Sequence, residues 1–237
     1  MTGPLVVITG ASSGIGLAIA RAFAAEGHAL LLIARHMKPV DGLPEERTAY
    51  AEADVADYAA IERAIRDAEA RFGKTACLLN NAGMADARGF HDVDPESYAR
   101  EIDVNLKGVF NCTKVVIGDM SAAKSGTIIN ISSISDRKTS PVALGYTASK
   151  YGVRAFGESL REAEGMNGVR VVNVAPAYIR TNIHAGMGIS FDKYKEILGN
   201  PDFMSAEELA GIVLYCWKLP PTICIRDIVV APTRSTF

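Results

Sequence analysis

Thr9-Gly-Ala-Ser-Ser-Gly-Ile-Gly16 follows the apolar run Leu5-Val-Val-Ile8 near the start of the chain. The run predicts a buried strand, and residues 15–26 have apolar positions at helical spacing. The stretch between them therefore predicts a strand–turn–helix unit. Glycines in such a turn let the backbone approach a phosphate, and the free N–H groups at the helix N-terminus attract an anion. We expect this turn to hold a dinucleotide pyrophosphate; the alternative is a turn that only packs the helix on the strand. The residues expected to contact the cofactor here are Gly10, Ser12, Ser13, Gly14, Ile15 and Gly16.

Similar apolar runs recur along the chain and alternate with segments of helical spacing. The expected strands are residues 5–9, 29–34, 48–53, 77–80, 127–131, 169–174 and 225–231. The expected helices are residues 15–26, 58–72, 99–123, 146–164 and 206–217, with Pro95 at a helix start and a capping box at Ser205–Glu208. Continuous apolar strands are typical of a parallel sheet covered on both faces. The sequence predicts an α/β fold: a single Rossmann-like domain over residues 1–237, with a doubly wound parallel sheet of about seven strands flanked by helices on both faces.

The composition argues against several classes of protein. The formal net charge of the 237 residues is −2, and the basic residues are scattered, so neither nucleic acid nor an anionic membrane is an expected partner. Four cysteines form no CxxC pair and have no histidine at metal-ligand spacing, so no metal site is expected. The N-terminus shows no basic leader, and its apolar run is too short to span a membrane. We expect a cytoplasmic protein.

The run Tyr146-Thr-Ala-Ser-Lys150 carries the most specific chemical signal. Side chains at i and i+4 share one face of a helix, so this phenol lies beside an ammonium group. A phenol with a pKa of about 10 is a poor acid or base at neutral pH, but a nearby cation favours phenolate. The hydroxyl of Ser133 stands thirteen residues upstream. The arrangement predicts proton transfer coupled to hydride transfer.

Arg35 comes at the end of the second expected strand, where NAD-binding Rossmann folds place an acidic residue on the ribose 2′-hydroxyl. An arginine there suits a 2′-phosphate, since its paired N–H donors match phosphate oxygens. The alternative is a solvated surface arginine. We expect NADP(H) as the cofactor.

Five motifs in order resemble those of the short-chain dehydrogenase/reductase family, in its short single-domain branch. They are residues 9–16, Asp54-Val55, Asn80-Asn-Ala-Gly83, Asn105, and Ser133 with Tyr146 and Lys150. The resemblance implies that Asp54 and Val55 contact adenine, and that Asn80, Asn81, Ala82 and Gly83 line the adenosine ribose and steady the central strand.

The resemblance also implies the catalytic roles. Ser133 would bond the substrate oxygen, Tyr146 would be the acid/base, and Lys150 would bind the nicotinamide ribose and lower the pKa of Tyr146. Asn105 would order a water that leads protons from Lys150 to bulk; it could instead only cap or kink a helix. Ser132 is the alternative to Ser133, but the spacing to Tyr146 favours Ser133.

One position departs from the family pattern. The family has Pro-Gly after the sixth strand, and this chain has Pro176-Ala177. Alanine allows fewer backbone conformations than glycine, so the loop can take a different path. Ile179 and Thr181 still match the residues that bond the nicotinamide carboxamide.

We therefore expect an NADP(H)-dependent oxidoreductase that interconverts a carbonyl and an alcohol on a small molecule. Residues 177–204 are the expected substrate-binding loop, with His184 a candidate for contact with a polar substrate. The alternatives are a non-catalytic NADPH-binding regulator and an epimerase or dehydratase that uses the same Tyr/Lys pair. The family resemblance further implies a homo-oligomer, a dimer or a homotetramer, paired through residues 99–123 and 146–164.

Overall fold

Seven parallel strands form one sheet in a computed structural model that describes residues 3–181, 183 and 190–235. The strand order is β3-β2-β1-β4-β5-β6-β7, so the direction of winding reverses between β1 and β4. The strands are β1 (Gly3–Thr9), β2 (His28–Ala34), β3 (Thr48–Glu52), β4 (Thr75–Asn80), β5 (Gly126–Ile131), β6 (Val169–Pro176) and β7 (Asp227–Val230). Open α/β sheets bind ligands outside the carboxyl ends of the strands at such a reversal. The predicted seven-stranded parallel sheet is confirmed.

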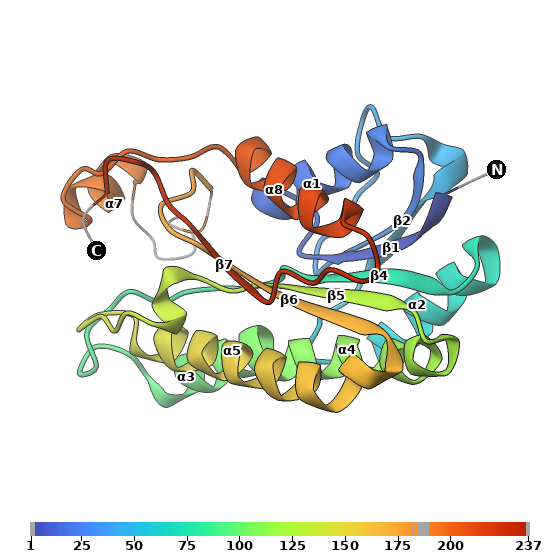
Figure 1. The fold of residues 1–237 in the computed structure, drawn as a ribbon. Coiled ribbons are helices and arrows are strands. Elements are labelled where there is room, and N and C mark those ends of the chain that lie inside the picture. Colours follow the sequence, from blue (N-terminus) through green and yellow to red (C-terminus); the bar gives the residue numbers. More distant parts are fainter. Residues whose placement is uncertain (1–2, 182, 184–189, 236–237) are drawn as a thin grey trace.

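Helices cover both faces of the sheet (Figure 1). On one face lie α1 (Gly14–Ala25) and α8 (Ala206–Lys218), and on the other lie α2 (Tyr58–Phe72), α4 (Gly108–Ala123) and α5 (Leu144–Glu164). Successive residues of β1 point to opposite faces. Accordingly Val6 and Ile8 are buried in the cluster under α1 and α8, and Leu5 and Val7 in the cluster under α2 and α4.

The expected helix over residues 99–123 is wrong in detail. The chain forms α3 (Pro95–Ile102), then a wider π-helical turn, η2 (Asp103–Lys107), and then α4. A Cβ at Gly108 would lie 2.6 Å from Cγ2 of Val55, so the helix here runs close to the loop after β3. A π turn inserts one extra residue, which apolar spacing does not reveal.

Two helix starts are confirmed at atomic detail. The Asp94 side chain accepts a hydrogen bond from Ser97 N (2.8 Å), with Pro95 at the first helical position of α3. At the start of α8, Glu208 N donates to Ser205 Oγ (3.1 Å), and Ser205 N donates to Glu208 Oε2 (2.7 Å). Side-chain caps of this kind satisfy the N–H groups that the first turn leaves without partners.

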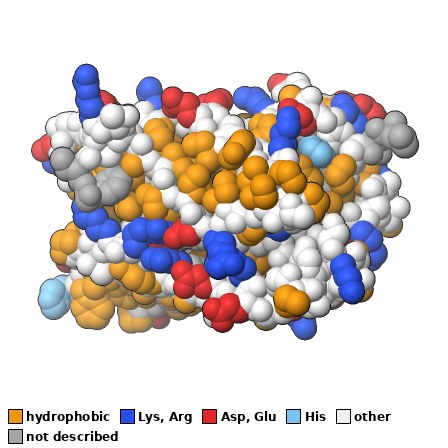
Figure 2. All heavy atoms as spheres, viewed as in Figure 1, with side chains coloured by type: hydrophobic (Ala, Val, Ile, Leu, Met, Phe, Trp, Pro, Cys, Tyr) orange, Lys and Arg blue, Asp and Glu red, His pale blue; other side chains and the backbone are white. Residues whose placement is uncertain are grey.

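β7 is the edge strand of the sheet and is shorter than expected. Apolar side chains gather in a band over α8 and β7 (Figure 2), and Tyr215, Ile223 and Val229 are exposed. None of the helices in the described ranges is both long and apolar enough to cross a membrane.

Candidate active site

The glycine turn after β1 is shaped by its contacts with the loop after β4. Gly10 and Gly14 have φ of 65° and 54°, a region in which side chains are strained. A Cβ at Gly16 would lie 2.4 Å from Gly10 O. Asn81 Nδ2 donates to Thr9 O (2.9 Å) and to Gly10 O (3.1 Å), which fixes the turn against the neighbouring strand. The turn therefore requires glycine on geometric grounds.

The N-terminus of α1 fits an anionic ligand. Ser13 is the N-cap residue, and its side chain caps none of the helix N–H groups; the first turn has no acidic residue. Leu17 N is bonded to Ser13 O, which leaves the N–H groups of the preceding turn for a ligand. Free N–H groups together with the positive end of the helix dipole suit a pyrophosphate.

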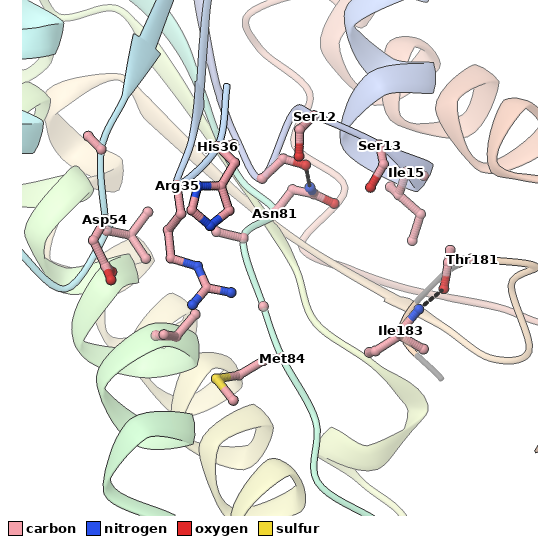
Figure 3. Close-up of a pocket in the computed structure, with 18 residues that line it drawn as sticks. Ser12, Ser13, Ile15, Arg35, His36, Asp54, Asn81, Met84, Thr181 and Ile183 are labelled. Carbon is pink, nitrogen blue, oxygen red and sulfur yellow. Dashed lines mark hydrogen bonds between the residues drawn. The ribbon is translucent and has the colours of Figure 1, made fainter. Parts of the chain in front are cut away.

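A cavity of about 340 Å³ opens in front of this turn (Figure 3). Its lining brings together most of the residues expected at the cofactor: Gly10, Ser12, Ser13, Gly14, Ile15, Arg35, Asp54, Val55, Asn81, Ala82, Gly83 and Thr181. Gly16 is absent from the lining because it lies in the helix behind the turn. Residues from five separate segments of the sequence thus line one cavity.

Arg35 and His36 lie at one end of this cavity, beside Asp54 (Figure 3). The Arg35 side chain is exposed and makes no hydrogen bond or ion pair with any of the described residues. Asp54 is already engaged: Arg100 pairs with its carboxylate, and Ala56 N donates to Oδ1 (2.9 Å). Burial would raise the pKa of Asp54, but the Ala56 N–H and Arg100 outweigh it and lower the pKa. Among the described residues that line this end of the cavity, Arg35 is thus a cation without an ion-pair partner.

Tyr146 and Lys150 lie on one face of α5, at the edge of a second cavity of about 140 Å³. This cavity shares Ile15, Asn81 and Gly83 with the first, so the two adjoin each other. Lys150 Nζ lies 5.6 Å from the centroid of the Tyr146 ring and donates to Ile131 O (2.9 Å). The predicted phenol–ammonium pair is present.

Burial dominates the acidity of this pair. It raises the pKa of Tyr146 to about 12, although the Ser133 hydroxyl opposes the rise through a hydrogen bond. It lowers the pKa of Lys150 to about 8. The lowering of the Tyr146 pKa by Lys150 together with a charged cofactor ring stays a prediction for the protein with its cofactor bound. A further positive charge is needed to favour phenolate.

Ser133, not Ser132, is turned toward the phenol. Ser133 Oγ accepts a hydrogen bond from Ser135 N (3.1 Å), which caps the 3-10 turn η3 (Ile134–Asp136). With this acceptor position used, the hydroxyl proton remains available for an oxygen in the cavity. Ser132 also lines the cavity, but its Oγ is buried and has no partner within the described chain.

Asn105 lies in the π turn η2 and is almost fully buried (1% exposed). Its Nδ2 donates to Met84 O (2.9 Å) and to Ser149 Oγ (3.0 Å), and its Oδ1 accepts from Met84 N (2.9 Å). It therefore ties the loop after β4 to the helix that carries Tyr146 and Lys150. These three hydrogen bonds link separate segments, whereas a helix cap would bond only the backbone of its own helix. The side chain has no donor left for a water on the way to Lys150.

The loop after β6 places the remaining expected residues. Pro176, Ile179 and Thr181 line the catalytic cavity. Ala177 is buried, and its N–H donates to Val230 O (2.8 Å), so alanine is held against β7. Part of the expected substrate loop contains α7 (Phe191–Ile197), while Asn182 and residues 184–189, including His184, lie outside the described residues.

Two tyrosines of the catalytic cavity were missed. Tyr178 and Tyr194 line it together with Ser133 and Tyr146. Both rings also contact Phe203, with centroid distances of 6.0 and 6.2 Å. The sequence marked the loop but gave no signal that selects these aromatic residues, because α7 folds back over the cavity only in three dimensions.

Comparison with known proteins agrees with this geometry. The family described as short chain dehydrogenase matches residues 4–188. Oxidoreductase UcpA of Salmonella typhimurium is 36% identical over 76% of this chain and 71% of its own length. Sulfoacetaldehyde reductase 2 of Chromohalobacter salexigens is 33% identical over 98% of this chain and 96% of its own.

A solved structure is similar over nearly the whole fold. It is an alcohol dehydrogenase from Thermococcus sibiricus, complexed with 5-hydroxy-NADP, with a TM-score of 0.84, 26% identity, and coverage of 96% of this chain and 95% of the other. Sequence motifs, sheet order and these relatives agree, and the chain belongs to the short-chain dehydrogenase family.

Proposed function

We propose that this protein is an NADP(H)-dependent oxidoreductase that interconverts a ketone or aldehyde and the corresponding alcohol, with Tyr146 as the acid/base. The observation that carries the proposal is the half-buried phenol of Tyr146, beside Lys150 and hydrogen-bonded by Ser133, in a cavity that adjoins the one in front of the glycine turn. The family is one of oxidoreductases, and the reductase and dehydrogenase relatives support a carbonyl/alcohol reaction.

The residues around the larger cavity fit NADP(H). The uncapped start of α1 would bind the pyrophosphate, and the unpaired guanidinium of Arg35 would bind the 2′-phosphate. Asn81, Ala82 and Gly83 would line the adenosine ribose, and Lys150 the nicotinamide ribose. Pro176, Ala177, Ile179 and Thr181 would bound the nicotinamide. The solved relative complexed with an NADP derivative supports this choice.

The bound cofactor would supply hydride and, when oxidised, a positive ring charge. The protein's residues would handle the proton. In the direction of reduction, Tyr146 donates its proton to the substrate oxygen, and Ser133 donates a hydrogen bond to the same oxygen. Lys150, with a pKa of about 8, is a ready source of the proton that restores Tyr146. Asn105 holds the loop after β4 against α5.

Two other functions are less well supported. An epimerase or dehydratase with the same Tyr/Lys pair usually carries a separate substrate domain, and the matched relatives are reductases and dehydrogenases. A non-catalytic NADPH-binding regulator would not need a buried lysine beside the phenol, which burial makes costly for the fold. The presence of Ser133, Tyr146 and Lys150 around one cavity therefore favours an enzyme.

A fluorescence titration followed by an activity panel tests the proposal. NADPH is titrated into the protein, and its oxidation is then followed at 340 nm with ketones, aldehydes and diketones. We expect saturable binding and oxidation with at least one small carbonyl substrate. Binding without oxidation across the panel would indicate the regulator, and no binding would refute the proposal.

We also propose a cytoplasmic homo-oligomer, in which α4 and α5 pair between subunits. Phe110 on α4 and Tyr151 on α5 are 43% and 40% exposed. The Phe110 ring packs on Phe156 of α5 at a centroid distance of 4.6 Å, so aromatic side chains of the two helices meet on this side. Exposed aromatic side chains of this kind support an interface.

A further inference from the structure

Asp136 is a buried carboxylate in the turn that follows Ser133. Its side chain has no exposure to solvent. Its N–H donates to Ser133 O (2.9 Å), which closes the turn that carries the Ser133 hydroxyl. None of the roles above uses this residue. A charge at such depth is costly unless its partners hold it, so its surroundings indicate what it does.

Two side chains hold the Asp136 carboxylate. Arg137 Nε donates to Oδ1 (2.6 Å), and Asn173 Nδ2 donates to Oδ2 (2.9 Å). Asn173 belongs to a row of three buried asparagines in register on neighbouring strands, with Asn80 on β4 and Asn130 on β5. Asn80 Nδ2 donates to Asn130 Oδ1 (2.9 Å). The carboxylate is thus anchored to β6, the strand next to the edge strand β7.

The charged side chains around Asp136 are more exposed to solvent than Asp136 itself. Arg137 also pairs with Asp227 (2.8 Å), and Arg154 lies 3.9 Å from that carboxylate. The side chains of Arg137, Asp227 and Arg154 are 23%, 29% and 33% exposed, against 0% for Asp136. Water screens exposed charges far more than buried ones. In this cluster of two cations and two carboxylates, Asp136 is therefore the charge that water screens least.

Lys150 and Asp136 are both tied to the chain segment at the end of β5: Lys150 Nζ donates to Ile131 O (2.9 Å), two residues before Ser133, whose carbonyl accepts from Asp136 N (2.9 Å). Lys150 is 5% exposed and forms no ion pair with the part of the chain that the structure describes. Burial lowers its pKa to about 8, and Asp136 opposes the fall. The neighbouring Tyr146 is faced by Ser133 from the loop after β5, Tyr194 from α7, Asp136 from η3 and Glu101 from α3. Of these, Asp136 is the one that acts on the lysine.

We propose that Asp136 is a positioning residue of the active site, which keeps the Lys150 ammonium protonated at neutral pH and fixes the turn that carries Ser133. Held by Asn173 and Arg137, the carboxylate supplies the buried countercharge that Lys150 lacks in direct contact. The consequence for turnover rests on the proposed function. The protonation state of Lys150 does not, and it can be measured on the protein alone.

An NMR titration of lysine labelled with ¹³C at Cε tests the proposal. The Lys150 signal is identified by its loss in Lys150→Arg. We expect a midpoint near pH 8 for the native chain and a midpoint lower by about half a unit or more in Asp136→Asn. The matched control is Asp227→Asn, which removes a carboxylate from the same cluster at its exposed end. Its midpoint should stay close to that of the native chain.

A second variant shifts the midpoint in the opposite direction. Arg137→Gln removes the cation that partly neutralises Asp136, so it should raise the Lys150 midpoint; it also decides the question where Asp136→Asn does not fold. An unchanged midpoint in Asp136→Asn, a fall no larger than in Asp227→Asn, or no rise in Arg137→Gln would overturn the proposal.

The pH dependence of turnover provides the link to function. With NADPH and a carbonyl substrate, the alkaline limb of kcat should move to lower pH in Asp136→Asn, in step with the NMR midpoint. A limb that stays in place while the midpoint moves would contradict the role in turnover. If the native chain oxidises no NADPH but the midpoints shift as expected, the proposed function fails and the electrostatic role of Asp136 stands.

Discussion

At the scale of single residues, the site shows a conflict between stability and proposed chemistry at Lys150. Its pKa is about 8 in the folded protein, against an ordinary value of 10.5. The unfolded chain therefore binds the proton more tightly, and the buried ammonium destabilises the fold at neutral pH. This cost is full below pH 8 and disappears as the pH rises from about 8 to 10.5.

Lys150→Met should accordingly stabilise the protein while removing its activity. The substitution removes the cost of the pKa shift but also loses the hydrogen bond to Ile131 O. Together these should raise the free energy of unfolding by an amount on the order of 2 kcal/mol at pH 7. Urea unfolding at pH 7 and pH 9 measures it, and the gain should shrink at the higher pH. A variant less stable than the native chain at pH 7 would show that the lysine is not under strain.

Arg35 decides the choice of cofactor at the same scale. In Arg35→Ser, a charge-assisted hydrogen bond to the 2′-phosphate would be lost, which weakens NADPH binding roughly tenfold or more. NADH binding should hardly change. Fluorescence titration with both cofactors checks this, and Arg21→Ser, an exposed arginine of α1 outside the cofactor cavity, is the control. Equal losses for the two cofactors would argue against contact with the phosphate.

At the scale of elements, the π turn η2 links the parts of the site. Asn105 makes three hydrogen bonds there, to both backbone groups of Met84 and to Ser149 Oγ. Asn105→Ala leaves buried polar groups without partners and should cost about 2–3 kcal/mol, or roughly 5–10 °C in Tm. The control is Asn111→Ala on α4, which removes one hydrogen bond to Val55 O. It should lower the free energy of unfolding clearly less. Equal losses in thermal melts would contradict the bridging role.

The secondary-structure elements also show which features could be predicted from the sequence and which could not. Apolar periodicity predicted the strands and most helices, because burial on both faces leaves a pattern in the chain. It did not predict η2, since one extra residue in a turn hardly disturbs that pattern. Nor did it single out Tyr194 or Asp136, whose positions depend on how α7 and η3 fold against strands distant in the sequence. The motif residues around the glycine turn could be placed because their spacing reflects a fixed backbone geometry.

At the scale of the whole molecule, the apolar surfaces predict assembly. The face of α4 and α5 with Phe110 and Tyr151 is one such surface, and the band over α8 and β7 is a second (Figure 2). Two separate surfaces of this kind favour a homotetramer over a dimer.

Size-exclusion chromatography with light scattering checks this expectation. Phe110→Asp should reduce the assembly to a smaller species, because a carboxylate would be buried in the interface without a partner. Met166→Asp, at a side chain that is 94% exposed, is the control and should leave the assembly intact. A native chain that elutes as a monomer would contradict the expectation for both surfaces.

The most direct test compares Tyr146→Phe with Tyr151→Phe, two tyrosines of α5 of which the first lines the cavity and the second is exposed. NADPH binding is measured by fluorescence, and NADPH oxidation is measured with the best carbonyl substrate of the panel. Tyr146→Phe should bind NADPH nearly as tightly as the native chain and lose a factor of about 100 to 10,000 in turnover, while Tyr151→Phe keeps both. Substantial turnover by Tyr146→Phe would contradict the assignment of this phenol as the acid/base.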